Sequence, residues 1–211
     1  MNAVASRLVL GALALAGCVA FSVDATDGFR ILTSARQPAV RALRHPAFEL
    51  PLRTADAGLV STLPAPGRLR VVEITYERCR TVCTLQGGAL AEAFRALQAD
   101  VAAQHLHFVS LSVDPGDCPA GIARRVQRLG GGAPGWAGLC VADEAALGAL
   151  TRRLGVVAIR DARQDYRHTE GVFLVGADGR VLAYEPSLDK QTLVLAIRAA
   201  LQRDSGAAPH G

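Results

Sequence analysis

The chain has 211 residues, half of them hydrophobic, and a formal net charge of +4. This length suits one packed domain with some terminal sequence to spare. The basic residues are nearly all arginines and are scattered along the chain, without the dense basic stripe and interleaved aromatic residues of a nucleic-acid-binding protein, so we expect no nucleic-acid partner.

The first 23 residues predict an export or anchoring segment outside the folded domain. Arg7 is followed by sixteen uncharged residues before Asp24. Within this run, LAGC resembles the lipobox of bacterial lipoproteins, with Cys18 as the lipidated residue, whereas the apolar residues after Cys18 favour an uncleaved membrane anchor. Both alternatives place the domain in the bacterial periplasm, tethered to the inner membrane, where disulfides form.

Three further segments follow this anchor. Residues 24–44 are predicted to be a linker, residues 45–203 the folded domain, and residues 204–211 a frayed tail. The folded part keeps four cysteines, and the sequence alone leaves three possible pairings among them.

The first predicted elements of the domain lead up to a pair of cysteines. Residues 47–52 and 58–63 form a short edge hairpin, and the β-branched run at 68–76 is a buried strand. Cys79 and Cys83 follow this strand directly. After them, apolar residues at helical spacing predict a helix that continues to about residue 104.

Strands and helices alternate through the rest of the domain. A buried strand is predicted at 107–114, followed by a helix that begins at Pro119, is capped by Asp117 or Cys118, and ends at glycines 130–132. A short strand at 136–141 and a helix from the cap Asp143 to Gly155 come next. The domain then has a hairpin at 170–185 that turns on Asp178-Gly179 and a last helix opened by Ser187. His105 and His107 flank the entry to the strand at 107–114, and we expect both to face solvent.

This order predicts an α/β fold with a mixed central β-sheet flanked by helices. It is the order of a thioredoxin-like fold with an N-terminal hairpin and an inserted strand–helix unit between residues 117 and 155. Functional residues of such folds lie at the carboxyl ends of the parallel strands. Because Cys79 and Cys83 come just after one such end, we expect the site there.

The spacing of Cys79 and Cys83 leaves three interpretations open. At a helix start, their side chains lie at i and i+4 on one face, within reach of one ion. The helix amides and dipole favour the thiolate, as do Arg78 and Arg80, while Glu77 opposes them. Since thiolates both bind metals and attack disulfides, the pair is a metal site or a redox pair. The third interpretation is a structural disulfide or two inert thiols.

His168 distinguishes between these interpretations. It lies in DYRHT, immediately before the predicted hairpin, in the loop that faces the cysteines of thioredoxins and carries a proline there. In this chain no proline lies between Arg152 and Tyr184. Two thiolates and an imidazole suit copper, because sulfur holds Cu(I) and nitrogen helps to accommodate Cu(II). We therefore expect His168 to be the third ligand of a copper site.

The sequence resembles the SCO/SenC copper-assembly proteins over roughly residues 45–202. Four stretches carry the resemblance, namely CRTVC with the two cysteines, SVDPGDCP after the second buried strand, GWAGLC after the following helix, and DYRHT before the hairpin. The resemblance implies a membrane-tethered domain that binds one copper ion, Cu(I) or Cu(II), through Cys79, Cys83 and His168. It also implies that Asp114 lies near the site and helps to orient the ligands.

The resemblance further implies a function and partners. The domain would deliver copper to, or reduce thiols of, the binuclear copper site of cytochrome c oxidase. Subunit II of that enzyme is then the expected copper acceptor, and periplasmic thiol reductants are further partners. The alternative is a thiol–disulfide oxidoreductase without an essential copper role, in which Cys79 or Cys83 attacks a substrate disulfide and the other resolves it. A non-catalytic lipoprotein whose cysteine pair forms only a structural disulfide is a third possibility.

The chain departs from the family pattern close to the cysteines. Arg80 and Thr84 stand where the family usually has prolines, and Cys118 and Cys140 stand where it usually has threonines. Cys118 and Cys140 lie at the ends of two strands that we expect to be adjacent, so they form either a second disulfide or two unrelated buried thiols. A disulfide between Cys79 and Cys83 is expected in the oxidised protein without metal, and Cys118 could exchange with that pair.

Overall fold

The computed structural model describes residues 49–65, 68–79, 82–162, 165–186 and 189–206. The expected anchor, with Cys18, and the expected linker lie outside these residues. Within the described ranges, no helix combines the length and the hydropathy that a membrane span requires.

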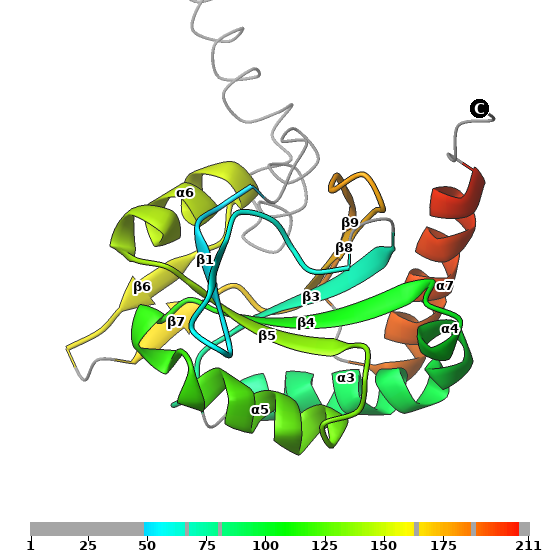
Figure 1. Cartoon of the computed structure of the whole chain (residues 1–211), viewed down its shortest axis with the longest axis horizontal. Helices are drawn as coiled ribbons and strands as arrows, with labels where there is room; N and C mark the ends of the chain where they lie inside the picture. The colour runs from blue at the N-terminus through cyan, green and yellow to red at the C-terminus, as the bar shows by residue number, and fades with distance from the viewer. Residues whose placement is uncertain (1–48, 66–67, 80–81, 163–164, 187–188, 207–211) are drawn as a thin grey trace, which may run out of the picture.

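A seven-stranded mixed β-sheet forms the centre of the domain (Figure 1). Its order is β2-β1-β5-β4-β3-β8-β9, in which β3, β4 and β5 are parallel while β1 and β8 run antiparallel to their neighbours. The strands are β1 Leu52–Thr54, β2 Leu59–Val60, β3 Leu69–Thr75, β4 Leu106–Ser112, β5 Trp136–Val141, β8 Val172–Val175 and β9 Val181–Glu185. All residues of β3 are buried, which explains why it is rich in β-branched residues. The sheet confirms the predicted α/β fold.

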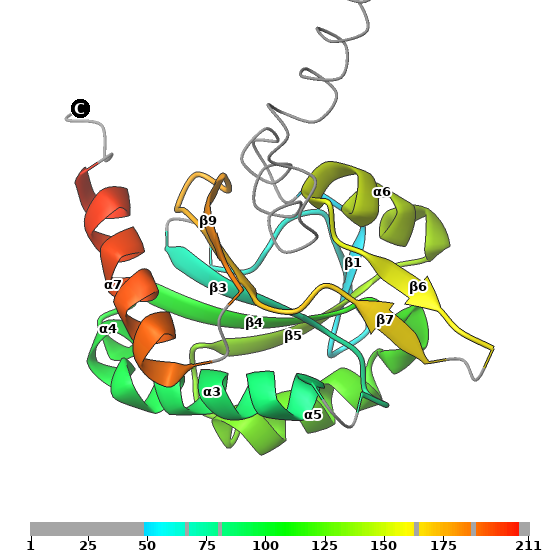
Figure 2. The same ribbon diagram turned by 180° about the vertical axis from the view of Figure 1, so that it is seen from behind.

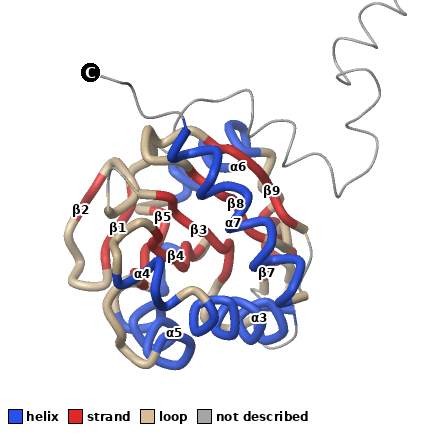
Figure 3. Tube along the Cα trace, turned by 90° about the vertical axis from the view of Figure 1, so that its right-hand side faces the viewer, coloured by secondary structure: helices blue, strands red, loops and turns tan. Residues whose placement is uncertain are grey.

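Helices cover both faces of this sheet. They are α3 Val82–Ala96, α4 Gln98–Ala102, α5 Ala120–Gly130, α6 Glu144–Leu154 and α7 Lys190–Gly206, with the short 3-10 helix η2 Pro115–Asp117. Figure 3 shows α3 and α5 together on one side of the sheet and α6 on the other. Alternate residues of β3 therefore enter two cores: Val71 packs in the core of α3 and α7, and Val72 in the core of α6.

A separate two-stranded ribbon stands at the end of the molecule away from α7 (Figure 2). Its strands are β6 Ala158–Arg160 and β7 Tyr166–His168, paired so that Ala158 lies opposite His168. The sequence predicted a loop here, and that prediction is wrong, since His168 is the last residue of a strand. Each strand has three residues, too few for an alternating pattern to be visible in the sequence.

Two helix boundaries also differ from the prediction. The helix expected to run to residue 104 is divided into α3 and α4, because Leu97 leaves the helical backbone (φ −111°, ψ 21°) while its side chain is fully buried. Helix α5 follows Pro119 and is not capped by Asp117. The Asp117 carboxylate instead accepts the backbone N–H of Glu77 at 2.7 Å and the hydroxyl of Ser112, so it holds the chain after β3.

A disulfide joins Cys118, just before α5, to Cys140 near the end of β5. Cys140 is fully buried, and Cys118 is partly exposed. The bond therefore ties the connection between η2 and α5 to the sheet, one residue from Asp117. Of the two alternatives left by the sequence, the structure has the second disulfide.

Replacing both Cys118 and Cys140 with alanine removes this covalent tie. The disulfide joins residues 22 positions apart and restricts the unfolded chain, so we expect a loss of about 2–4 kcal/mol in the free energy of unfolding. Urea denaturation of the oxidised protein measures the loss. Peptide mapping without reduction that finds both thiols free in the wild type would contradict the disulfide.

His107 does not face solvent, contrary to the expectation from sequence. It lies half-buried in β4, and neither ring nitrogen has a hydrogen-bond partner among the described residues. Burial, with smaller contributions from the charges of Arg68 and Arg70, lowers the pKa of His107 to about 4. His105 is exposed, as expected.

The lowered pKa of His107 makes folding stability depend on pH. The unfolded chain, with a histidine pKa of about 6.5, binds the proton more readily than the folded protein. The contribution of neutral His107 to the free energy of unfolding is therefore fully present above pH 6.5 and is lost as the pH falls towards about 4. We expect His107→Gln to flatten the dependence of unfolding free energy on pH in this window, while His105→Gln leaves it unchanged. Denaturation at several pH values tests this, and an unchanged slope in His107→Gln would contradict the burial.

Candidate metal centre

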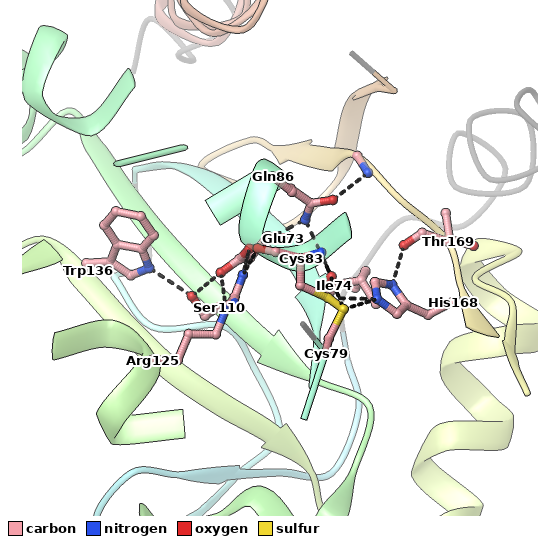
Figure 4. Close-up of polar contacts among 11 residues, drawn as sticks. Glu73, Ile74, Cys79, Cys83, Gln86, Ser110, Arg125, Trp136, His168 and Thr169 are labelled. Carbon is pink, nitrogen blue, oxygen red and sulfur yellow. Dashed lines mark hydrogen bonds and ion pairs between the residues drawn. A yellow bond between two sulfur atoms is a disulfide. The ribbon is translucent and has the colours of Figure 1, made fainter. Parts of the chain in front are cut away.

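Cys79 lies between β3 and α3, and Cys83 lies in the first turn of α3, at the carboxyl end of the parallel strands (Figure 4). After β3 the chain turns, so that the Cys79 N–H donates to the Tyr76 carbonyl at 3.3 Å, and Cys83 is the second residue of α3. The two sulfurs form a disulfide, with the Cα atoms 5.7 Å apart. Cys83 is fully buried, whereas Cys79 is partly exposed and its Sγ accepts the Cys83 N–H at 3.3 Å. This amide belongs to the first helical turn, where N–H groups lack a partner within the helix, and its bond to Cys79 Sγ favours the thiolate.

His168 faces both sulfurs through Nε2, which lies 2.9 Å from Cys83 Sγ and 3.8 Å from Cys79 Sγ. The other ring nitrogen, Nδ1, lies 2.8 Å from the Thr169 carbonyl oxygen. Because a carbonyl oxygen only accepts, Nδ1 carries the proton and Nε2 keeps its lone pair. Burial lowers the pKa of His168, which favours this neutral form. The imidazole is therefore held in the tautomer that a metal ligand needs.

These three side chains can hold a metal ion together. Their ligand atoms all lie within 4.8 Å of one another, and in the described part of the chain no other such group of His, Cys, Asp or Glu residues occurs. Two sulfurs and one imidazole nitrogen are soft to intermediate donors, which suit copper or zinc rather than magnesium or calcium. In the disulfide the sulfurs are joined, and reduction by two electrons and two protons converts them to two thiols. The site thus has an oxidised form and a reduced, metal-binding form.

The ribbon of β6 and β7 holds the histidine side of the site. Thr169 N–H donates to the Val157 carbonyl at 2.9 Å, and Val157 N–H donates to the Thr169 hydroxyl oxygen at 2.7 Å. The ring of Tyr76, just after β3, packs edge-on against the His168 ring with centroids 5.6 Å apart. The imidazole is therefore held between the ribbon and the chain that leads to the cysteines.

Asp114 lies beside the ribbon and does not contact the ligands. Its carboxylate accepts the Gly116 N–H at 2.9 Å and lies 3.6 Å from the guanidinium of Arg160, which stacks over the ring of Tyr166 at 4.8 Å. Among the described residues, Asp114 has no interaction with any of the three ligands. Its connections to the site are indirect, through Arg160 to the ribbon and through Ser112 to Asp117, which binds the Glu77 N–H.

Reasoning from sequence missed three polar residues next to the site. Arg125 of α5 donates to the Cys83 carbonyl at 3.1 Å and pairs with the buried carboxylate of Glu73 in β3. Gln86 of α3 accepts the N–H of Gly171, in the segment that follows β7, at 2.8 Å. One signal was present in the sequence, because a glutamate inside a buried strand requires a buried partner. Nothing in the sequence indicated which residue that partner is.

The model of the SCO1/SenC family matches residues 41–202. Among solved structures, the chain is similar to copper-bound ScoI of Bradyrhizobium japonicum, with 26% identity, a TM-score of 0.58, and coverage of 73% of this chain and 96% of that one. It is also similar to a SCO1/SenC family lipoprotein of Bacillus anthracis, with 19% identity, a TM-score of 0.67, and coverage of 77% and 96%.

A third solved structure is that of BsSco, described as having a disulfide switch and as a member of the Sco family of cytochrome c oxidase assembly proteins. It has 17% identity, a TM-score of 0.57, and coverage of 75% of this chain and 95% of that one. These structures confirm the predicted thioredoxin-like fold. A comparison with curated proteins gives no match. Because the family model matches most of the sequence, including all three converging side chains, the chain belongs to the SCO1/SenC family.

Proposed function

We propose that this protein is a copper chaperone that holds one copper ion between Cys79, Cys83 and His168 and transfers it to an apoprotein of cytochrome c oxidase. The observation that carries the proposal is the approach of His168 Nε2 to both sulfurs, which adds a nitrogen donor to a thiol pair. Family membership supports it, as do the copper bound by Bradyrhizobium japonicum ScoI and the assembly role given for BsSco.

Copper loading starts from the reduced thiols. A periplasmic thiol reductant gives two electrons to the Cys79–Cys83 disulfide, which becomes two protein thiols while the reductant becomes a disulfide. Each thiol loses its proton when its sulfur binds copper. The neutral Nε2 of His168 binds without releasing a proton, because the ring proton stays on Nδ1.

The unequal burial of the two sulfurs sets the direction of release. Cys83 is fully buried, whereas Cys79 is partly exposed. A thiolate of the copper acceptor therefore reaches the ion from the Cys79 side and replaces that ligand first. Transfer then proceeds by ligand exchange, without a free ion at any step. The acceptor we propose is subunit II of cytochrome c oxidase, at its binuclear copper site.

Residues 1–23 supply the proposed attachment to the membrane. Lipid on Cys18 or an uncleaved apolar helix would tether the domain to the periplasmic face of the inner membrane. The support for this location is the uncharged run after Arg7. An oxidising periplasm also suits the two disulfides of the folded domain.

A thiol–disulfide oxidoreductase is the second candidate function, and the disulfide between Cys79 and Cys83 favours it. Cys79 is the member that a substrate thiol or disulfide reaches, because Cys83 is fully buried. The Cys79 thiolate would attack the substrate disulfide, and Cys83 would then resolve the mixed disulfide. Neither step needs a nitrogen ligand, so His168 separates the two functions.

A Cu(I) titration of the reduced protein therefore compares the wild type with His168→Ala. We expect the wild type to bind one ion at the site and His168→Ala to bind it at least about tenfold more weakly, because one of three donors is lost. His105→Ala is the matched control, since His105 is exposed and outside the site. A Cys79→Ser/Cys83→Ser variant measures copper held by the remaining thiols.

Equal copper affinities of the wild type and His168→Ala would contradict the proposed chaperone. A wild type that binds no copper but exchanges rapidly with a disulfide substrate would replace the chaperone function with the oxidoreductase function.

A further inference from the structure

A buried polar network lies between the sheet and helices α3 and α5, next to the cysteine pair (Figure 4). Its centre is Glu73 of β3, which is 0% exposed, and Arg125 of α5, which is 5% exposed. Arg125 donates from Nε and Nη2 to the two carboxylate oxygens of Glu73, at 2.9 and 2.7 Å. Ser110 donates to the same carboxylate and accepts from Trp136 Nε1 at 3.0 Å. Both charges therefore have hydrogen-bonded partners inside the core.

An ion pair in this place adds little to stability by itself, because the desolvation of two charges offsets most of their attraction. The pair does fix the orientation of every other group that it bonds. Two of those bonds lead away from the network towards the metal centre.

The first of these bonds reaches the cysteine side. Arg125 Nη2 donates to the carbonyl oxygen of Cys83 at 3.1 Å. Helix α5 approaches α3 closely here because residue 87 is glycine. A Cβ on Gly87 would lie 3.2 Å from the Arg125 guanidinium and 3.0 Å from Leu129. The first turn of α3, and Cys83 with it, is therefore held from the side of α5.

The second bond reaches the histidine side through Gln86, which is 1% exposed. Its Oε1 accepts the Gly171 N–H at 2.8 Å, and its Nε2 lies 3.4 Å from both Glu73 Oε2 and the Ile74 carbonyl oxygen. The amide orientation follows from the partners, because an N–H only donates and a carboxylate or carbonyl only accepts. Gln86 therefore joins the buried ion pair to the segment after β7.

Two connections of the same sequence separation thus link α3 to this segment. Cys83 Sγ lies 2.9 Å from His168 Nε2, and three residues further along both segments Gln86 Oε1 accepts the Gly171 N–H at 2.8 Å. Gly171 is itself firmly seated, with φ +95°, and a Cβ there would lie 2.5 Å from the Glu185 carbonyl oxygen.

We infer that Gln86 is a positioning residue, through which the buried Glu73–Arg125 pair holds the His168 segment at ligand distance from Cys83. The inference rests on the proposed function only for its effect on copper, since the mechanical connection exists in the metal-free protein. Glutamine suits the position because it both donates and accepts. A glutamate would place a second carboxylate against Glu73, and a leucine would leave the buried Gly171 N–H without a partner.

Gln86→Leu tests the inference in the full-length protein in detergent, with two readouts. Hydrogen–deuterium exchange of the metal-free protein reports on the backbone of residues 168–171. Cu(I) affinity of the reduced protein reports on the site. We expect exchange in this segment to be at least about tenfold faster and copper binding to be about tenfold weaker than in the wild type, as found for residues that orient metal ligands.

Ile197→Val is the control for a general loss of stability. Ile197 is a fully buried residue of α7, and its shortening by one methyl group lowers stability without removing any group of the network. We expect it to leave both readouts unchanged. Unaltered exchange at 168–171 in Gln86→Leu, unaltered copper affinity, or equal changes in Ile197→Val would overturn the inference. A wild type that binds no copper would refute the proposed function alone, and the exchange measurement would then decide the inference.

Discussion

The contact between His168 Nε2 and Cys83 Sγ, at 2.9 Å, joins parts of the chain that are 85 residues apart, and the rest of the site depends on it. Two neighbouring cysteines alone make a redox pair or a structural disulfide. The imidazole adds a neutral nitrogen donor, already in the required tautomer because its Nδ1 proton is bound by the Thr169 carbonyl. The fold must therefore hold two supports, the cysteine segment after β3 and the β6–β7 ribbon that carries His168, at a constant distance from each other.

The two supports differ in strength. The cysteines follow β3, a fully buried central strand, and Arg125 holds the first turn of α3 through the Cys83 carbonyl. The histidine lies on a two-stranded ribbon outside the main sheet, with Ile159 62% exposed. Such a ribbon has little stability of its own. Its position then depends on a few contacts from the better-packed part, namely Tyr76 packing and the Gln86–Gly171 bond.

The sequence was sufficient to predict the sheet and the three side chains that converge at the candidate site, but not the residues that hold these side chains in place. The β-branched run of β3 and the capping Asp143 of α6 are local signals, and the structure has both elements. His168 was predicted from its place in the loop that faces the cysteines and from the preference of copper for two thiolates and an imidazole, and the family resemblance implied the same residue. The Glu73–Arg125 pair spans 52 residues and is visible only once α5 lies on β3 and α3. Asp117 or Cys118 was predicted as the cap of the following helix. The bond that Asp117 makes instead, to the Glu77 amide, could not be predicted because it depends on tertiary structure.

X-ray absorption spectroscopy at the copper edge, on the protein loaded with one equivalent of Cu(I), tests the central claim most directly. The converging side chains predict a first coordination shell of two sulfur atoms and one nitrogen atom, with the nitrogen lost in His168→Ala. A shell of sulfur atoms alone, identical in the wild type and in His168→Ala, would contradict the role of His168 as a ligand.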